Sequence, residues 1–268
     1  MTDPTQTSAG GTTTPQATAL YVYGVIPAAD AAGWPGADGV DGPAAQVRAI
    51  QEGGLAALVS DIPGDRVPGR REDLEAHRRV LALAIEHGTA IPMRFGMVMD
   101  SEDLVRRRLL VKHGSELGDL LRTLDGQVQM TIRAFYAEDA LLRNVMETNA
   151  DIANRTAALQ GLPELATRPE RIALGEAVAA AVDARRARDE QALLDRLKQF
   201  ASDVRVDPPG GDRVALNAQL LVPRDRRVAL DDAVRELGSA LQGYLALRYI
   251  GPLPAYSFSE LSLESGDE

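Results

Sequence analysis

The sequence has no cysteine, few aromatic residues and a deficit of basic side chains. Without cysteine, the chain has no disulfide, no zinc thiolate site and no cysteine nucleophile. Aromatic residues make up only 4%, so the core must rest mainly on alanine, leucine, valine and isoleucine. The formal net charge of −10 opposes binding to phosphate backbones. We therefore expect no nucleic-acid partner unless the fold gathers a basic patch.

Long hydrophobic runs are also missing. No segment reaches the roughly 18 consecutive apolar residues that a membrane-spanning helix needs. The first residues, 1–18, are rich in threonine, serine, glycine and proline, and they lack the basic start and apolar stretch of a signal peptide. We expect a disordered tail over 1–18, an acidic tail over 261–268, a cytoplasmic location and no membrane partner.

The motifs of several enzyme classes are absent as well. The chain has no Gly-x-x-x-x-Gly-Lys-Ser/Thr phosphate loop, no Gly-x-Gly-x-x-Gly and no Gly-x-Ser-x-Gly elbow. Its paired glycines, Gly10-Gly11 and Gly210-Gly211, do not follow a predicted strand and open a helix. We predict no catalytic residue, no cofactor-binding residue, no metal ligand and no enzyme activity.

The histidines are His77, His87 and His113. His77 and His87 lie on one predicted helix, roughly 15 Å apart along its axis, which is too far for one metal ion to bind both. His77 is on the apolar face, and we expect a core or interface histidine with a hydrogen-bonded ring. The alternative is a small-molecule-binding sensor or enzyme, for which His77 and Arg94 are the candidate residues.

Hydrophobic periodicity in the first half predicts strands and helices that form an α+β domain over 19–124. Ser101 is the expected N-cap of the last helix. The expected strands are 20–26, 55–60 and 90–99, and the expected helices are 72–87 and 101–124. Pro92 indicates that the strand over 90–99 begins there or lies at a sheet edge.

The second half, 125–260, has predicted strands at 127–136, 201–206, 214–222 and 245–250. Its predicted helices are 138–159, 170–200 and 230–241, of which the first two could pair as a long helical hairpin. This order, βαββαβ, is typical of a ferredoxin-like domain. We therefore predict two α+β domains: an N-terminal α/β sandwich related to the ferredoxin-like fold, and a C-terminal ferredoxin-like domain with a long helical hairpin.

Five segments, taken together and in order, form a recognisable pattern: Tyr21-Val-Tyr-Gly-Val-Ile26, Leu55-Ala-Ala-Leu-Val-Ser60, Leu74-Glu-Ala-His-Arg-Arg-Val-Leu81, Ile91-Pro-Met-Arg-Phe-Gly-Met-Val98 and Gly251-Pro-Leu-Pro-Ala-Tyr-Ser-Phe258. These segments resemble the GvpF/GvpL family of gas vesicle proteins. The family often has a Glu-Trp pair where Gln129 and Met130 stand, and Met97, Leu253 and Ala255 also depart from its pattern.

The resemblance implies an accessory or minor structural protein of gas vesicle assembly. It implies association with the hydrophobic shell protein and with other gas vesicle accessory proteins, without catalysis or a cofactor. We expect sheet edges and helix faces to offer the apolar surface for such partners. The residues of that surface are unknown from the sequence.

Overall fold

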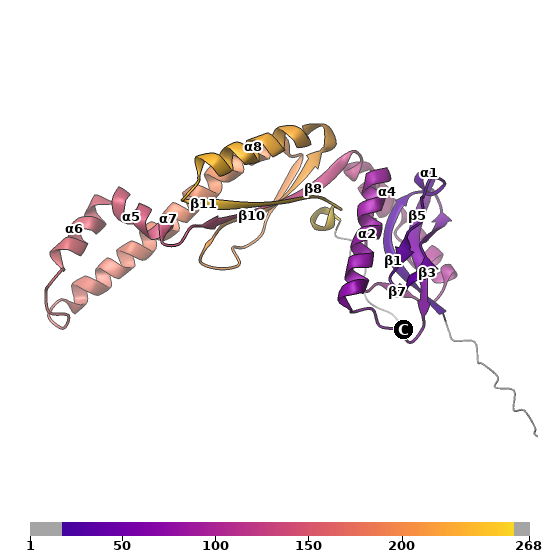
Figure 1. The fold of residues 1–268 in the computed structure, drawn as a ribbon, viewed down its shortest axis with the longest axis horizontal. Coiled ribbons are helices and arrows are strands. Elements are labelled where there is room, and N and C mark those ends of the chain that lie inside the picture. Colours follow the sequence, from indigo (N-terminus) through magenta and orange to yellow (C-terminus); the bar gives the residue numbers. More distant parts are fainter. Residues whose placement is uncertain (1–17, 260–268) are drawn as a thin grey trace, which may run out of the picture. The chain divides into compact units, whose positions relative to one another are not determined.

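The computed structural model describes residues 18–259, which form two compact units divided between Arg122 and Thr123 (Figure 1). Each unit combines helices with an antiparallel sheet, so the expected mixture of helix and strand is confirmed. Of the expected tails, only Thr18 lies within the described residues, where it begins the first strand.

The first unit contains a sheet centred on β1 (Thr18–Pro27). The strand order is β4-β5-β1-β6, and β7 pairs with a separate part of β1. The other strands are β4 (Arg48–Glu52), β5 (Leu55–Pro63), β6 (Ile91–Pro92) and β7 (Val98–Met99). The helix α2 (Arg71–His87) packs its apolar side chains on this sheet, as the pattern over 72–87 predicted.

The segment between β1 and β4 is more structured than the expected loop. It contains α1 (Ala28–Ala31) and a small hairpin of β2 (Asp38–Gly39) and β3 (Gly42–Gln46). The strands β2, β3 and β4 were missed because glycine and polar residues interrupt the alternation that marks a strand.

The predicted continuous strand over 90–99 is wrong. The chain pairs with β1 in two short stretches, around Gly24↔Pro92 and around Leu20↔Met99, and turns between them. Gly96 has a φ of +89°, in the left-handed region that glycine adopts easily. Pro92 has no N–H to donate, which limits the ladder on this side.

The predicted single helix over 101–124 is also wrong. It is divided into α3 (Glu102–Leu104), a π-helical segment η1 (Val105–Val111) and α4 (Gly114–Leu124). Ser101 does cap the start, since its Oγ accepts the N–H of Leu104 at 3.3 Å. A π-helical segment is rare and is defined by its i→i+5 hydrogen bonds, which hydrophobic periodicity alone does not predict.

The second unit has a four-stranded antiparallel sheet in the order β11-β8-β10-β9. The strands are β8 (Gln127–Tyr136), β9 (Asp203–Val206), β10 (Val214–Pro223) and β11 (Leu245–Leu253). Alternate residues of β8, from Val128 to Tyr136, pack with residues of α7 (Arg168–Leu197) and α8 (Arg227–Ala240). The helices therefore cover one face of the sheet. Short 3-10 turns, η2 (Lys198–Phe200), η3 (Arg224–Arg226) and η4 (Tyr256–Phe258), complete the unit.

A long helical hairpin extends from this sheet. The helices α5 (Ala140–Thr148) and α6 (Ala150–Ala158) pack against the first part of α7 (Figure 1). The predicted single helix over 138–159 is wrong at Asn149, whose extended backbone breaks it. The Asn149 side chain accepts the N–H of Ile152 at 3.2 Å and so caps α6.

Candidate functional site

Three of the segments that resemble the gas vesicle family converge on one buried hydrogen-bonded group in the first unit. Tyr21 of β1 lies between His77 of α2 and Gly96 of the turn before β7. Its hydroxyl accepts the N–H of Gly96 at 3.0 Å and lies 3.0 Å from Nδ1 of His77. We assign the hydroxyl proton to this second bond, which leaves the ring proton of His77 on Nε2, a buried nitrogen near the backbone of Met93 that forms no hydrogen bond within residues 18–259.

His77 is enclosed by aromatic rings. The ring of Tyr23 stacks on it at 5.8 Å and that of Phe95 meets it edge-on at 5.7 Å, between ring centroids. Burial lowers the pKa of His77 to about 4, and Arg78 lowers it further, against the opposing effect of the Met93 backbone. The ring is therefore neutral at pH 7. This is the expected core histidine, and it lines no opening because only 1% of the residue is exposed.

The remaining residues singled out in the sequence do not join His77 in a site. The side chain of Arg94 points to solvent. His87 bonds the carbonyl of Leu83, and His113 lies 3.6 Å from Glu116. Residues 18–259 hold no group of three or more histidine or acidic side chains placed to bind a metal ion.

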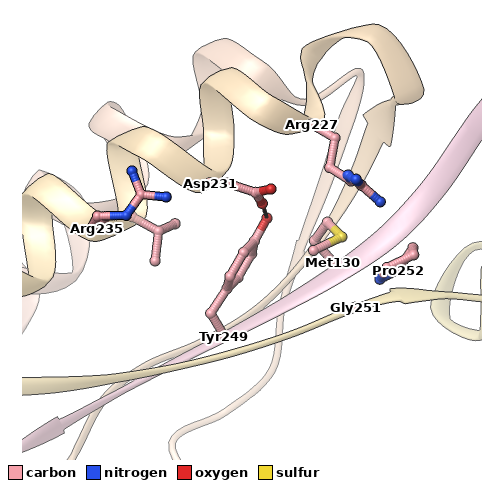
Figure 2. A pocket seen from close by; sticks show the side chains of 8 residues that line it. Met130, Arg227, Asp231, Arg235, Tyr249, Gly251 and Pro252 are labelled. Carbon is pink, nitrogen blue, oxygen red and sulfur yellow. Dashed lines mark hydrogen bonds between the residues drawn. The ribbon is translucent and has the colours of Figure 1, made fainter.

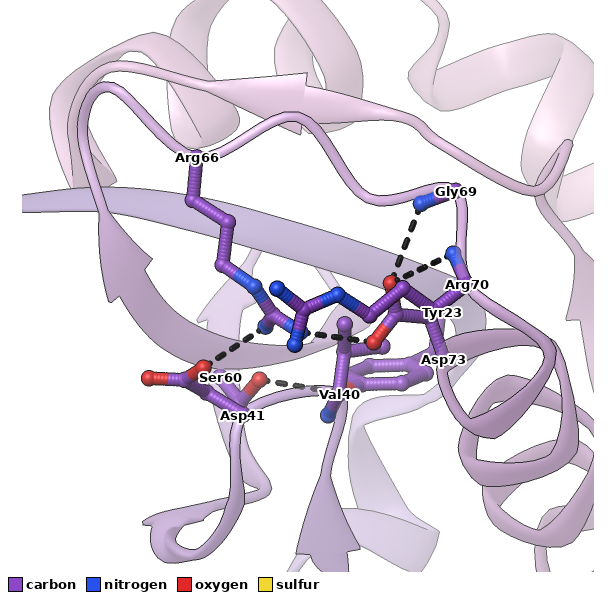
Figure 3. Close-up of polar contacts among 8 residues, drawn as sticks. All are labelled: Tyr23, Val40, Asp41, Ser60, Arg66, Gly69, Arg70 and Asp73. Carbon is purple, nitrogen blue, oxygen red and sulfur yellow. Dashed lines mark hydrogen bonds and ion pairs between the residues drawn. The ribbon is translucent and has the colours of Figure 1, made fainter.

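A second polar group fixes the loop that leads into α2 (Figure 3). Arg66 forms ion pairs with Asp73 at 2.6 Å and with Asp41 at 2.8 Å. Asp73 also accepts the N–H groups of Gly69 and Arg70, both at 3.0 Å. Burial alone would raise the pKa of Asp73, but these hydrogen bonds and the charge of Arg66 hold it below its ordinary value. These residues satisfy one another's hydrogen bonds and charges, so the group has a structural role.

The second unit has a pocket of about 510 Å³ between α8 and β11 (Figure 2). Tyr249 of β11 points into it and donates its hydroxyl proton to Asp231 of α8 at 2.6 Å. Burial, followed by this hydrogen bond, raises the pKa of Tyr249 above its ordinary value, so the hydroxyl remains a donor. Arg227 and Arg235 lie one helical turn on either side of Asp231, and Arg235 forms an ion pair with Asp232, so the rim of the pocket carries charges of both signs.

The floor of this pocket depends on Gly251. A Cβ at this position would lie 2.5 Å from Sδ of Met130 and 3.0 Å from the carbonyl oxygen of Gln129. Its φ of +149° also favours glycine. Glycine therefore lets β11 pass close over β8, where Met130, Val234 and Pro252 supply the apolar lining.

The sheet face opposite the helices carries a pair of arginines. Arg133 of β8 and Arg248 of β11 are directly opposite each other in the antiparallel register. Both guanidinium groups lie 5.4 Å from the ring centroid of Phe135. Neither arginine forms an ion pair with a carboxylate of residues 18–259, and Nε of Arg133 is buried without a hydrogen-bond partner. Like charges placed this way repel, so the pair leaves a local positive charge on an acidic protein.

The two edges of this sheet differ in how well they are protected against pairing with a further strand. The β9 edge has four residues, includes Asp203, and is followed by Asp207 and Pro208. Short length, charge and proline all discourage further strand pairing. The β11 edge is longer: its residues 245–250 pair regularly with β8 before the register breaks at Gly251 and Pro252, and the exposed Ala246 and Ile250 are apolar. Within the described chain β11 pairs with β8 alone, so its outer edge is open.

The sequence placed Arg133 on the polar face of its strand but gave no sign of the Arg133–Arg248 pair, the pocket or the open edge. These features depend on the register between strands that are distant in the chain. No helix within 18–259 combines the length and hydrophobicity needed to cross a bilayer.

Comparison with known proteins finds relatives that are gas vesicle proteins F. The chain is 38% identical to gas vesicle protein F of Streptomyces sp. (strain CB03234) over 90% of this chain and 99% of that one. It is 26% identical to gas vesicle protein F of Microcystis aeruginosa (strain PCC 7806) over 90% and 98% of the two chains.

Solved structures agree. The crystal structure of GvpF from Anabaena sp. PCC7120 superposes with a TM-score of 0.80 at 24% identity, covering 91% of this chain and 99% of that one. GvpF from Microcystis aeruginosa gives 0.73 at 25% identity, with the same coverage. The family model for gas vesicle synthesis protein GvpL/GvpF matches residues 19–260. The chain therefore belongs to the GvpL/GvpF family of gas vesicle synthesis proteins.

Proposed function

We propose that this protein is a non-enzymatic accessory of gas vesicle assembly that works in the cytoplasm and binds the hydrophobic shell protein and other gas vesicle accessory proteins. The observation that carries the proposal is the family match over 19–260 together with the relationship to a Streptomyces gas vesicle protein F. Family membership supports the assembly role, and the binding of partners is our extension of it.

The surface that best fits a hydrophobic partner is the far end of the helical hairpin. Leu165, in the connection between α6 and α7, is 90% exposed; Leu162 of the same connection is 47% exposed and Ile172, near the start of α7, is 54% exposed. We name these three residues the hairpin tip. Apolar side chains exposed together on a soluble protein commonly mark a contact surface. The charge of −10 would keep a complex with an apolar partner in solution.

The finer description of the fold is also a proposal. In the second unit, the order of elements is strand, helices, strand, strand, helix, strand, and numbering its strands from one to four gives the sheet order 4-1-3-2. This connectivity supports a ferredoxin-like C-terminal domain that carries the hairpin as an insertion. We propose the N-terminal unit as a second α+β domain.

Co-expression with the shell protein tests the proposed function. The tagged full-length chain should retain the shell protein, and deletion of the gene should reduce vesicle formation. Replacing all three hairpin-tip residues with serine should lower retention. The matched control is Val67→Ser, because Val67 is 89% exposed but lies in the first unit. Normal vesicles in the deletion strain, with no retention by the wild type, would overturn the proposal.

A further inference from the structure

We propose that β11 is a docking edge to which an extended, acidic segment of a partner protein adds as a fifth strand of the sheet in the second unit. The inference rests on the proposed function only for the source of this segment, which we take to be another protein of the gas vesicle system. It adds the mode of binding, the surface and the charge of the ligand.

The backbone of β11 supplies the first part of the argument. The carbonyl of Tyr244 accepts the N–H of Ala137 at 2.9 Å, so the polar backbone groups of Tyr244 point toward β8. In an antiparallel strand this direction alternates, and the N–H and C=O groups of Leu247 and Tyr249 therefore point outward. A partner strand would bond to these groups, as in other strand-addition complexes.

Two different side-chain sites lie on the two faces of this edge. On the helix face, Tyr249 borders the pocket whose apolar floor and charged rim are described above. On the open face, Arg248 is exposed beside Arg133. Successive side chains of an added strand point to opposite faces, so one would approach the pocket and the next would approach Arg248.

The charge of the arginine pair indicates which kind of strand binds at the β11 edge. Arg133 and Arg248 repel each other and have no carboxylate partner in the described chain. A carboxylate on an added strand next to Arg248 would relieve this repulsion. A second copy of the chain is a poorer occupant, because antiparallel pairing of two β11 edges would bring a further copy of the same arginines onto the same face. The geometry thus favours a different protein with an acidic, extended segment.

Peptide binding to the purified full-length chain tests the inference. The probes are overlapping peptides that cover the shell protein and the other gas vesicle proteins encoded near this gene. We expect acidic peptides of β-forming sequence to bind. Arg248→Glu should lower the affinity for these peptides at least about fivefold, since an attractive cross-strand charge pair becomes a repulsive one. Arg226→Glu is the matched control, because it makes the same charge change at another exposed position of this unit.

The backbone contribution is tested separately. Leu247→Pro removes one outward N–H without touching the ladder to β8 and should weaken binding about tenfold. Leu247→Ala keeps that N–H and should bind more tightly than Leu247→Pro. Thermal unfolding shows whether each variant is folded. Independently of any variant, hydrogen exchange on the wild-type protein should show new protection of the Leu247 and Tyr249 amides when a peptide binds.

Reversal of the peptide's acidic residue to lysine should weaken binding to the wild type by a similar factor and restore binding to Arg248→Glu. Equal binding by the wild type, Arg248→Glu and Leu247→Pro, without amide protection in β11, would overturn the inference. A chain that forms dimers through β11 and binds no peptide would also overturn it. If the shell protein is still retained through the hairpin tip in either case, the proposed function stands while the docking edge fails.

Discussion

Tyr21 and His77 form a buried hydrogen bond of 3.0 Å that joins the central strand of the first unit to the helix that covers it. The same tyrosine hydroxyl holds the backbone of Gly96, so one side chain ties a strand, a helix and a turn together. These residues belong to three of the segments that resemble the gas vesicle family. Tyr21 and His77 are buried, so their role is to hold the elements of the first unit together.

The first unit should lose stability as the pH falls from about 6.5 to 4. His77 has a pKa of about 4 in the folded protein and an ordinary value of 6.5. The unfolded chain therefore binds more protons in this window, and protonation favours unfolding. We expect the free energy of unfolding to fall by about 2 kcal/mol between pH 7 and pH 5 through this group. Urea denaturation at both pH values measures the change.

The His77→Leu variant should lose most of that pH dependence. Its stability at pH 7 can change as well, so the comparison is the difference between the two pH values within each variant. His87→Leu is the control, because His87 is an exposed histidine on the same helix. An unchanged pH dependence in His77→Leu would show that another group titrates in this window.

Tyr21→Phe should destabilise the first unit by about 1–3 kcal/mol. The change leaves the N–H of Gly96 without its acceptor and Nδ1 of His77 without its hydroxyl partner. Tyr249→Phe is a useful comparison, because it also removes one hydroxyl hydrogen bond but at a partly exposed site. Chemical denaturation should rank Tyr21→Phe as the more damaging change, and the reverse order would contradict the buried network.

Local patterns in the sequence predicted elements well where the pattern continues without interruption. The alternation over 127–136 gives β8 with its observed bounds, and the apolar stripe over 72–87 gives α2 to within one residue. The prediction of His77 as a hydrogen-bonded core residue follows from its place on that stripe. In these cases, neighbouring residues alone determine which face is buried.

The failures occur where the conformation of a few residues overrides the pattern. Gly96 permits a turn inside an alternating stretch, and Asn149 caps a new helix inside a helical one. The candidate surface was harder still to predict. The Arg133–Arg248 pair exists only because of strand register, which no local pattern specifies. The pocket likewise requires α8 to lie over β11, which is a tertiary contact.

Asp189→Ala should loosen the attachment of α7 to the sheet. The Asp189 carboxylate accepts the hydroxyl protons of Tyr136 at 3.0 Å and Tyr244 at 2.6 Å, and it pairs with Arg185 at 2.9 Å. Removing it leaves two hydroxyls and a guanidinium without this partner, at a cost of about 2–4 kcal/mol. Chemical denaturation measures the loss. Asp195→Ala on the same helix is the control, since its partners Lys198 and Gln191 are exposed, and an equal loss in both variants would contradict a special role for Asp189.

Two glycine substitutions should have opposite effects on stability. At Gly24 of β1, an added Cβ would lie 2.7 Å from the carbonyl oxygen of Ile91 and 2.9 Å from Cδ2 of Leu81. The backbone oxygen cannot rotate away, so Gly24→Ala must push β6 outward and should cost about 1–3 kcal/mol. At Gly175, inside α7, an added Cβ meets nothing within 4 Å. Gly175→Ala should therefore raise the free energy of unfolding by roughly 0.5–1 kcal/mol through helix propensity.

Thermal and urea unfolding of the two glycine variants, measured beside the wild type, show whether the free energy of unfolding falls in Gly24→Ala and rises in Gly175→Ala. Hydrogen exchange shows where the Gly24→Ala protein is loosened. Its amides in β1 and β6 should exchange faster than in the wild type, while those of α2 remain protected. A neutral Gly24→Ala would mean that β6 can move away from β1 freely. In that case the short pairing at Gly24↔Pro92 would contribute little to the fold. The turn that carries Gly96 would then be held by its bond to Tyr21 and by the hydrogen bond from the N–H of Val22 to the carbonyl of Met97.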